Sequence, residues 1–368
     1  MRIRRVLLFL VIAAVQFALF EAALRTWGHS EAAPAFQALF IPDSIIGYRL
    51  RPNVRTRFTT AEFDTEITID AQGVRDDRDV GPKPAGERRI VVLGDSLVMS
   101  VQVALRQTFC KLLEARLNRA AAGAAGAATV HYRVINAGVQ GYGPVEELLF
   151  FREIARAFQP DLVIETLFVG NDAEDAEASE QRLRGTQQSM PGMGSDSLVS
   201  RVRRLVRHSM VLQVFRVRVL SATERLSHRL SPPEAPLQSY AARPAPRIAQ
   251  GLRITRECVQ EIAKEADASG ARTVVMLMPA RFQVDDADYG RLKSAVEGAG
   301  GTLLRDGATV RFEEALAPVA LPRFDALPAL QAALPGPDVF FQQTVHLTPR
   351  GHEIVAEALE KFLRQQGF

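Results

Sequence analysis

Several residues with side chains or amides suited to catalysis stand directly after short apolar runs of the chain. Ser96 follows one such run, and Gly138 and Asn171 each follow another. His346 stands two residues before a Thr-Pro pair that is typical of a helix start. Acyl transfer needs a hydroxyl nucleophile, a base that activates it, and N–H donors that stabilise an oxyanion. The chain contains all three kinds of group.

The elements that must position these residues are apolar strands alternating with helices. Four runs are apolar on both faces, as buried strands are: 89–93, 132–136, 162–169 and 273–278. Helical patterns occur at 108–119, 144–157, 248–268 and, after Thr348-Pro349, up to Leu363. Strands covered by helices on both faces predict a three-layer α/β fold around a doubly wound parallel sheet.

In such a sheet the candidate residues come together, because the carboxyl ends of parallel strands share one edge. The hydroxyl and N–H of Ser96 would be accessible there, and Gly138 could aim its N–H closely at a ligand. Asn171 would offer its side-chain amide. A single serine after a strand is more often a helix cap, whereas this joint order favours a site. No G-x-S-x-G sequence occurs, which disfavours the α/β-hydrolase elbow.

In this order the residues resemble the motif blocks of the SGNH/GDSL hydrolases. The blocks correspond here to Gly94-Asp95-Ser96-Leu97, Gly138, Gly170-Asn171-Asp172 and His346. The resemblance extends over roughly 43–363 and is weakest at 174–247. Its first part, Gly47-Tyr48-Arg49-Leu50-Arg51-Pro52, is similar to membrane-anchored bacterial members of the family.

The resemblance implies a flavodoxin-like hydrolase domain that works through an acyl-enzyme. Ser96 would attack an ester carbonyl after giving its proton to His346. The N–H groups of Ser96 and Gly138 and the side chain of Asn171 would form the oxyanion hole. Two neighbouring acids would orient the loops without reacting: Asp95 and Asp172.

The chain departs from the family pattern just before His346. The family usually has Asp three residues before this histidine, where the chain has Gln343, followed by Thr344. Neither side chain has a negative charge that could orient the ring, and Asp338 is too far along the chain for the same turn. Three alternatives stay open: a Ser-His dyad supported by Gln343, an acid from elsewhere in the chain, or lost activity.

The N-terminus predicts a membrane anchor. The run 6–24 is apolar except for Gln16 and Glu21 and is long enough to cross a bilayer, and three arginines precede it. Their charge predicts a single-pass protein of the cytoplasmic membrane with its catalytic domain on the extracytoplasmic, periplasmic side. A cleaved signal peptide is the alternative, although the bulky residues that end the run disfavour it.

The expected domains follow from these segments: 1–28 as anchor or signal, 29–88 as a short β-rich preface, and 89–368 as the SGNH hydrolase domain with a helical insertion at about 174–247. The alternation at 63–69 indicates strands in the preface. The low-complexity segment 120–128 indicates a surface loop. The basic, apolar stretch 201–230 is read either as a helix packed on the domain or as one lying on a membrane surface.

Composition excludes several classes of function. A net charge of +3 and a pI near 9.0 are too mild to indicate nucleic-acid binding. The six histidines lack metal-ligand spacing with other ligand residues, so we expect no metal and no cofactor. The two cysteines, Cys110 and Cys258, lie in helical patterns and are expected to be buried thiols rather than a disulfide.

The sequence therefore predicts an extracytoplasmic serine esterase. The preferred substrate is an ester such as an O-acetyl group on an envelope glycan, which rests on the family resemblance and the expected topology. Two alternatives remain: an acyltransferase that moves an acetyl group to a polysaccharide, and a degenerate domain that binds glycan without chemistry. Protein partners are not indicated.

Overall fold

The computed structural model describes residues 16, 36, 38–123, 130–185, 237–333 and 338–368 of the chain. Apart from residue 16, they belong to one unit made of 32–185 and 235–368. The basic stretch 201–230 and most of the 120–128 loop lie outside the described residues.

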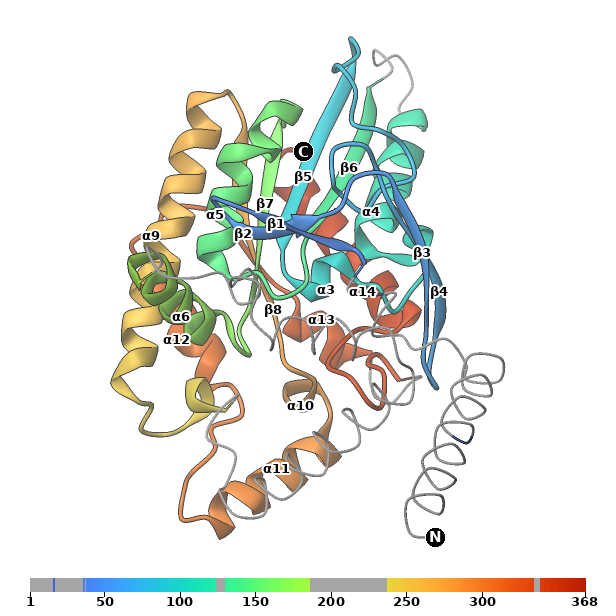
Figure 1. The fold of residues 1–368 in the computed structure, drawn as a ribbon. Helices are drawn as coiled ribbons and strands as arrows, with labels where there is room; N and C mark the ends of the chain where they lie inside the picture. The colour runs from blue at the N-terminus through green and yellow to red at the C-terminus, as the bar shows by residue number, and fades with distance from the viewer. Residues whose placement is uncertain (1–15, 17–35, 37, 124–129, 186–236, 334–337) are drawn as a thin grey trace, which may run out of the picture. The chain divides into compact units, whose positions relative to one another are not determined.

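A parallel sheet of five strands forms the centre of this unit, in the order β6-β5-β7-β8-β9 (Figure 1). Its strands are β5 (Glu87–Gly94), β6 (His131–Gly138), β7 (Leu162–Phe168), β8 (Arg272–Met278) and β9 (Arg323–Asp325). The first four coincide with the predicted apolar runs. The chain goes outward from β5 to β6 and then returns to the other side of β5 with β7. The switch point of the topology therefore lies at the end of β5, where ligands bind in such sheets.

Helices cover both faces of the sheet. Their bounds are α3 (Ser96–Met99), α4 (Phe109–Ala122), α5 (Pro144–Glu153), α6 (Asp172–Gly185), α9 (Pro246–Ala268), α10 (Arg281–Val284), α11 (Asp286–Gly298), α12 (Gly307–Leu316), α13 (Leu327–Ala332) and α14 (Pro349–Gln365). Short 3₁₀ turns occur at Leu105–Gln107, Ala155–Phe158 and Gln238–Tyr240.

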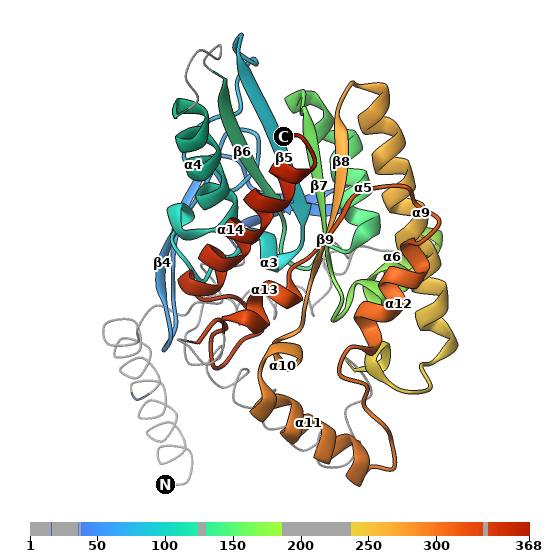
Figure 2. The same cartoon turned by 180° about the vertical axis from the view of Figure 1, so that it is seen from behind.

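Successive residues of β5 show why the sheet is buried on both sides. Ile90 and Val92 pack in a core that includes α4 and α14, whereas Val91 and Leu93 pack in a second core that includes α5. Figure 2 shows α14 and α4 across one face, and Figure 1 shows α5 on the other. This confirms the predicted α/β architecture of a parallel sheet between helices.

Two predicted helix boundaries are corrected by the structure. Helix α4 continues past residue 119 to Ala122, because alanine favours the helix. Helix α5 ends at Glu153, and a 3₁₀ turn takes up the following residues to Phe158. Helix α6 runs to Gly185, within the expected helical insertion at 174–247. Strand β9 is only three residues long and matches no apolar run of the sequence.

The C-terminal helix begins as its sequence predicts. The Thr348 side chain accepts a hydrogen bond from the Gly351 N–H, and Pro349 is the first helical residue. The buried face of α14 includes Val355, Leu359 and Leu363, which recur at helical spacing.

Two antiparallel hairpins precede the sheet. Strands β1 (Phe40–Asp43) and β2 (Gly47–Leu50) form the first, and β3 (Val54–Thr59) and β4 (Asp64–Ile69) form the second. The alternating burial of β4 places Thr65, Ile67 and Ile69 inward. The hairpins therefore have an apolar side that packs on the α/β unit, and Ile67 and Ile69 join the same core as Val91.

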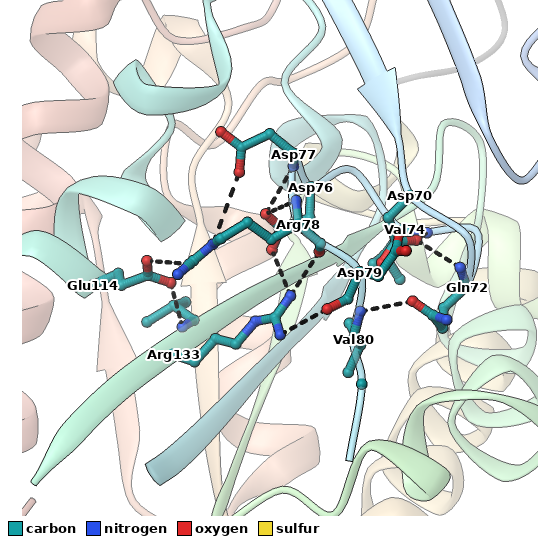
Figure 3. Close-up of polar contacts among 12 residues, drawn as sticks. Asp70, Gln72, Val74, Asp76, Asp77, Arg78, Asp79, Val80, Glu114 and Arg133 are labelled. Carbon is teal, nitrogen blue, oxygen red and sulfur yellow. Dashed lines mark hydrogen bonds and ion pairs between the residues drawn. The ribbon is translucent and has the colours of Figure 1, made fainter. Parts of the chain in front are cut away.

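The segment between β4 and β5 is tied to α4 and β6 by charged side chains (Figure 3). The buried Asp76 carboxylate lies 2.8 Å from Lys111 Nζ and 3.7 Å from an Arg133 nitrogen. Burial acts to raise the pKa of Asp76, but these two cations hold it below its ordinary value. Arg78 pairs with Glu114 of α4 at 2.6 Å. This segment therefore has a defined place on the sheet.

Arg75 of the same segment is buried completely and binds the end of α3. Its Nη1 donates to the carbonyls of Met99 (2.6 Å) and Ser100 (2.5 Å), and its Nη2 donates to Val103 O (2.6 Å). Burial lowers the pKa of Arg75 to about 10, so the guanidinium stays charged at neutral pH. The carbonyls at the end of a helix lack N–H donors within the helix, and the Arg75 guanidinium provides the missing donors.

Replacing Arg75 by Met should destabilise the fold strongly, because three buried carbonyls lose their donors. We expect the free energy of unfolding to fall by about 3 kcal/mol, measured by urea denaturation. Arg78→Met removes a half-exposed ion pair nearby and should cost less than about 1 kcal/mol. Equal losses in the two variants would contradict this role of Arg75.

Both cysteines are buried free thiols, as predicted. Cys110 lies in α4 and Cys258 lies in α9. Burial raises the pKa of each thiol to about 12.

The predicted membrane localisation is corrected by the structure. Among the described residues, no helix combines the length and apolar character needed to cross a bilayer. This finding contradicts the single-pass localisation, which rested on the length of the apolar run 6–24 and on the arginines before it. The run itself, 6–24, lies outside the described residues except for Gln16.

Candidate active site

The end of β5 presents Ser96 at the first turn of α3. The backbone of Gly94 has φ +153°, and a Cβ there would lie 2.3 Å from Val98 Cγ2, so only glycine allows α3 to pack this closely. The Asp95 carboxylate caps the helix by accepting from Leu97 N–H at 2.7 Å. Ser96 is half-buried, between the strand end and the helix.

The hydroxyl of Ser96 has no strong hydrogen-bond partner. It donates to Asp95 Oδ2 at 3.5 Å, a distance at the limit for a hydrogen bond. Burial raises the pKa of Asp95 to about 6. Among the described residues, no hydrogen bond joins the Ser96 hydroxyl to the His346 ring.

Gly138, at the end of β6, packs against α3. Its N–H donates to Asn136 Oδ1 at 3.2 Å, and a Cβ there would lie 2.3 Å from Met99 N. Asn136 in turn donates from Nδ2 to Val98 O at 2.7 Å. This geometry argues against Gly138 as an oxyanion donor, because its N–H is already used and helix α3 covers it.

Gly141, three residues further on, has the accessible backbone N–H that was expected of Gly138. It is exposed, has φ +77°, and its N–H makes no hydrogen bond to another described residue. Tyr48 of β2 lies against it: the Tyr48 hydroxyl donates to Gln140 O at 2.8 Å and is 2.9 Å from the position of a Gly141 Cβ. The sequence signal for Gly141 is its place in a Gln-Gly-Tyr turn rather than at the strand end.

The end of β7 presents Asn171 with one amide hydrogen bond in place. Its Nδ2 donates to Asp175 Oδ2 at 2.6 Å, and its buried Oδ1 has no partner among the described residues. An amide nitrogen has two hydrogens, so the second stays available. The neighbouring Asp172 accepts from Phe168 N–H at 2.7 Å, which fixes the turn at the end of β7.

His346 lies in a loop closed by a bridge between Phe340 and Leu347. Both ring nitrogens are buried and have no hydrogen-bond partner in the described part of the chain. Burial lowers the pKa of His346 to about 4, so the ring is neutral at pH 7. A neutral imidazole can accept a proton at one nitrogen.

Gln343 does not orient the His346 ring. It is exposed, and its backbone N–H donates to Glu62 Oε2 at 2.9 Å. No described side chain hydrogen-bonds to the ring, so neither the amide of Gln343 nor an acid takes the place of the usual Asp. Gln343 contributes to the loop through its backbone N–H, which binds Glu62, and not through its side chain.

A group of acids near the ends of β5 and β7 was not expected from the sequence. Four of them are buried and Asp175 is half-buried, and the members influence one another's titration: Asp95, Glu147, Glu165, Asp172 and Asp175. Burial raises the pKa of Glu165 to about 7, and burial with the nearby Glu165 raises the pKa of Glu147 well above its ordinary value. Neither carboxyl has a donor among the described residues other than this neighbour, so the pair is best explained as sharing protons.

The contribution of Glu165 to stability should therefore fall as the pH rises from about 4 to about 7. The folded state keeps the proton of Glu165 in this window, whereas the unfolded chain releases it near its ordinary pKa. Glu165→Gln cannot ionise, so its midpoint of thermal unfolding should exceed that of wild type by more at pH 8 than at pH 5. The exposed Glu153→Gln on α5 is the control and should show the same difference at both pH values. A pH-independent effect of Glu165→Gln would contradict the raised pKa.

One protein family model matches the C-terminal part of the chain. A family model described as an SGNH hydrolase-like domain, acetyltransferase AlgX, matches residues 238–368, which include His346. No curated protein sequence matches the chain. Within the described residues, no group of three or more His, Cys, Asp or Glu is arranged to hold a metal ion.

Solved structures show only a slight likeness. The structure of TesA has 16% sequence identity to this chain and a TM-score of 0.41. The match covers 76% of this chain and 99% of TesA. A catalytic mutant of the acetylxylan esterase Axe2 from Geobacillus stearothermophilus is 10% identical at 0.41, with 75% of this chain and 94% of that one covered. A lipase/acylhydrolase from Enterococcus faecalis is 15% identical at 0.40, with 76% and 96% covered.

Proposed function

We propose that this chain, which has an SGNH/GDSL hydrolase-type fold, acts on ester bonds through an acyl-enzyme on Ser96. One observation carries the proposal: the neutral His346 ring has two unpartnered nitrogens, in the part of the chain that matches the SGNH hydrolase-like domain. Burying a polar ring without a hydrogen-bond partner lowers the stability of the fold, so its presence calls for an explanation. A role as the base that accepts the Ser96 proton provides one.

The reaction would proceed in two halves. Ser96 Oγ gives its proton to a ring nitrogen of His346 and bonds to the ester carbonyl carbon, and the alcohol leaves with that proton. A water molecule then gives a proton to His346 and attacks the acyl carbon, and Ser96 Oγ leaves and regains the proton. Because the pKa of His346 is about 4, we expect slow hydrolysis: a base works best when its pKa is near the working pH.

The oxyanion would be stabilised by three donors: the N–H groups of Ser96 and Gly141 and the second amide hydrogen of Asn171. The Gly141 N–H has no acceptor among the described residues, whereas the Ser96 N–H faces the Asp95 carboxylate and would turn to the oxyanion when substrate binds. Gly141 replaces Gly138 of the sequence-based prediction. Asp95 and Asp172 hold the turns that carry these donors.

An acetyl ester, with a glycan as its carrier, is the substrate we propose. The support is the description of the matching family model as an acetyltransferase. The same description favours a second candidate, in which a sugar hydroxyl replaces water in the second half of the reaction. Both candidates share the acyl-enzyme, whereas a domain that only binds glycan would form none.

A fluorophosphonate probe should label wild-type protein on Ser96, and Ser96→Ala should abolish both labelling and hydrolysis of 4-nitrophenyl acetate. A nucleophile that forms a covalent intermediate is the target of such probes. Mass spectrometry of the labelled peptide identifies the residue. Absent labelling of folded wild type would contradict the acyl-enzyme and favour the binding domain. Faster loss of acetyl ester on adding an acetyl-accepting oligosaccharide would favour the transferase over the hydrolase.

Asn171→Ala should lower kcat by about 10²–10³ with little change in KM, as expected for loss of one oxyanion donor. The loss should appear in steady-state kinetics on 4-nitrophenyl acetate, with circular dichroism confirming that the variant is folded. If Asn171 only stabilises its turn, the folded variant will instead turn over at the wild-type rate.

A further inference from the structure

Two consecutive peptide groups of the His346 loop are held on both edges by charged side chains. On one edge, Arg281 Nη1 donates to Phe341 O (2.9 Å) and Gln342 O (2.6 Å). On the other edge, Glu62 Oε1 accepts from Gln342 N–H (2.7 Å) and Glu62 Oε2 accepts from Gln343 N–H (2.9 Å). The peptides 341–342 and 342–343 are therefore fixed between a cation and an anion.

Glu62 reaches this loop from the turn of the β3–β4 hairpin. Its own backbone N–H donates to Thr60 Oγ1 at 3.2 Å, which shapes the turn. The next residue, Phe63, packs on Phe341 with ring centroids 5.6 Å apart, and also on Phe58 at 5.3 Å. The hairpin thus contacts the histidine loop through both a carboxylate and an aromatic ring.

Arg281 is fixed on the opposite side of the loop. It begins helix α10, just after β8, and its Nε forms an ion pair with Asp288 of α11. Both side chains are largely buried, with 16% and 14% exposed. The Arg281 guanidinium is therefore held in place by its own contacts. It would not move with the His346 loop if the hydrogen bonds from Glu62 to that loop were lost.

The held peptides lead directly to the histidine. Phe341 N–H donates to His346 O at 2.9 Å, and His346 N–H donates to Thr344 Oγ1 at 3.3 Å. Because the loop is this short, a shift at 342–343 moves the histidine backbone. The ring itself has no hydrogen bond to hold it, so its place depends on the loop.

We propose that Glu62 is a positioning residue for His346, acting through the Gln342 and Gln343 peptides. The acid that the SGNH pattern has at position 343 would be replaced by one from the hairpin, which fixes the backbone rather than the ring. The consequence for turnover rests on the proposed function, whereas the consequence for the loop does not.

The test compares Glu62→Ala and Glu62→Gln with Glu66→Gln in the full chain. Glu66 lies on the same hairpin but is exposed and pairs with Arg55. Amide hydrogen exchange of Gln342 and Gln343 and the NMR titration of His346 are measured in each protein. Steady-state kinetics on 4-nitrophenyl acetate are measured in parallel.

In Glu62→Ala, exchange at both amides should accelerate by at least about tenfold, since they lose their acceptor. The midpoint of the His346 titration should move from about 4 toward the ordinary value of about 6.5, because the opened loop admits water. Glu62→Gln keeps one acceptor oxygen and should fall between Glu62→Ala and wild type. The value of kcat should drop by about 10–100-fold in Glu62→Ala with KM little changed, and Glu66→Gln should match wild type throughout.

Unchanged amide exchange and an unchanged His346 titration in Glu62→Ala would overturn the inference, and so would the same changes in Glu66→Gln. If wild type shows no turnover and no probe labelling while the exchange and titration respond to Glu62, the proposed function fails and the positioning role stands. If wild type turns over and kcat is insensitive to Glu62, the positioning role fails and the proposed function stands.

Discussion

The burial of the Arg75 guanidinium beneath α3 is the interaction on which the rest of the site depends. A charge removed from water is costly unless it is hydrogen-bonded, and three backbone carbonyls at and after the end of α3 accept from the two Nη atoms of Arg75, while its Nε has no partner among the described residues. Those carbonyls have no N–H donors within the helix, so the guanidinium gains acceptors and the helix end gains donors. The position of α3, and with it Ser96, is thereby coupled to the segment that precedes the sheet.

The same preceding segment reaches the other loops of the site as well. Tyr48 of the first hairpin donates to Gln140 O beside Gly141, and Glu62 of the second binds the loop of His346. Catalytic loops at the carboxyl edge of a parallel sheet leave backbone groups that the sheet itself cannot satisfy. Here the hairpins satisfy part of that need, so the hairpins and the loops at this edge of the sheet are structurally coupled.

Much of the fold could be predicted from the sequence, because buried parallel strands are continuous apolar runs and the cap at Thr348 is a local signal. The site could be predicted only in part. Gly138 was favoured because it ends a strand, but the geometry that frees an N–H arises in the turn at Gly141. The contact of Glu62 with Gln342 spans 280 residues, and no local pattern encodes it. The buried pair Glu147 and Glu165 is polar where periodicity predicts apolar residues.

The two thiols place a chemical reporter on each side of the sheet. Cys110 belongs to the core that includes α14, and Cys258 belongs to the core that includes α5. A thiol whose pKa is near 12 and whose sulfur is buried does not react with alkylating reagents while its layer stays closed. The rate at which each cysteine is alkylated thus measures how often the core around that cysteine opens. Equal rates for the two cysteines indicate global unfolding and different rates indicate local unfolding, so the wild-type chain needs no added label.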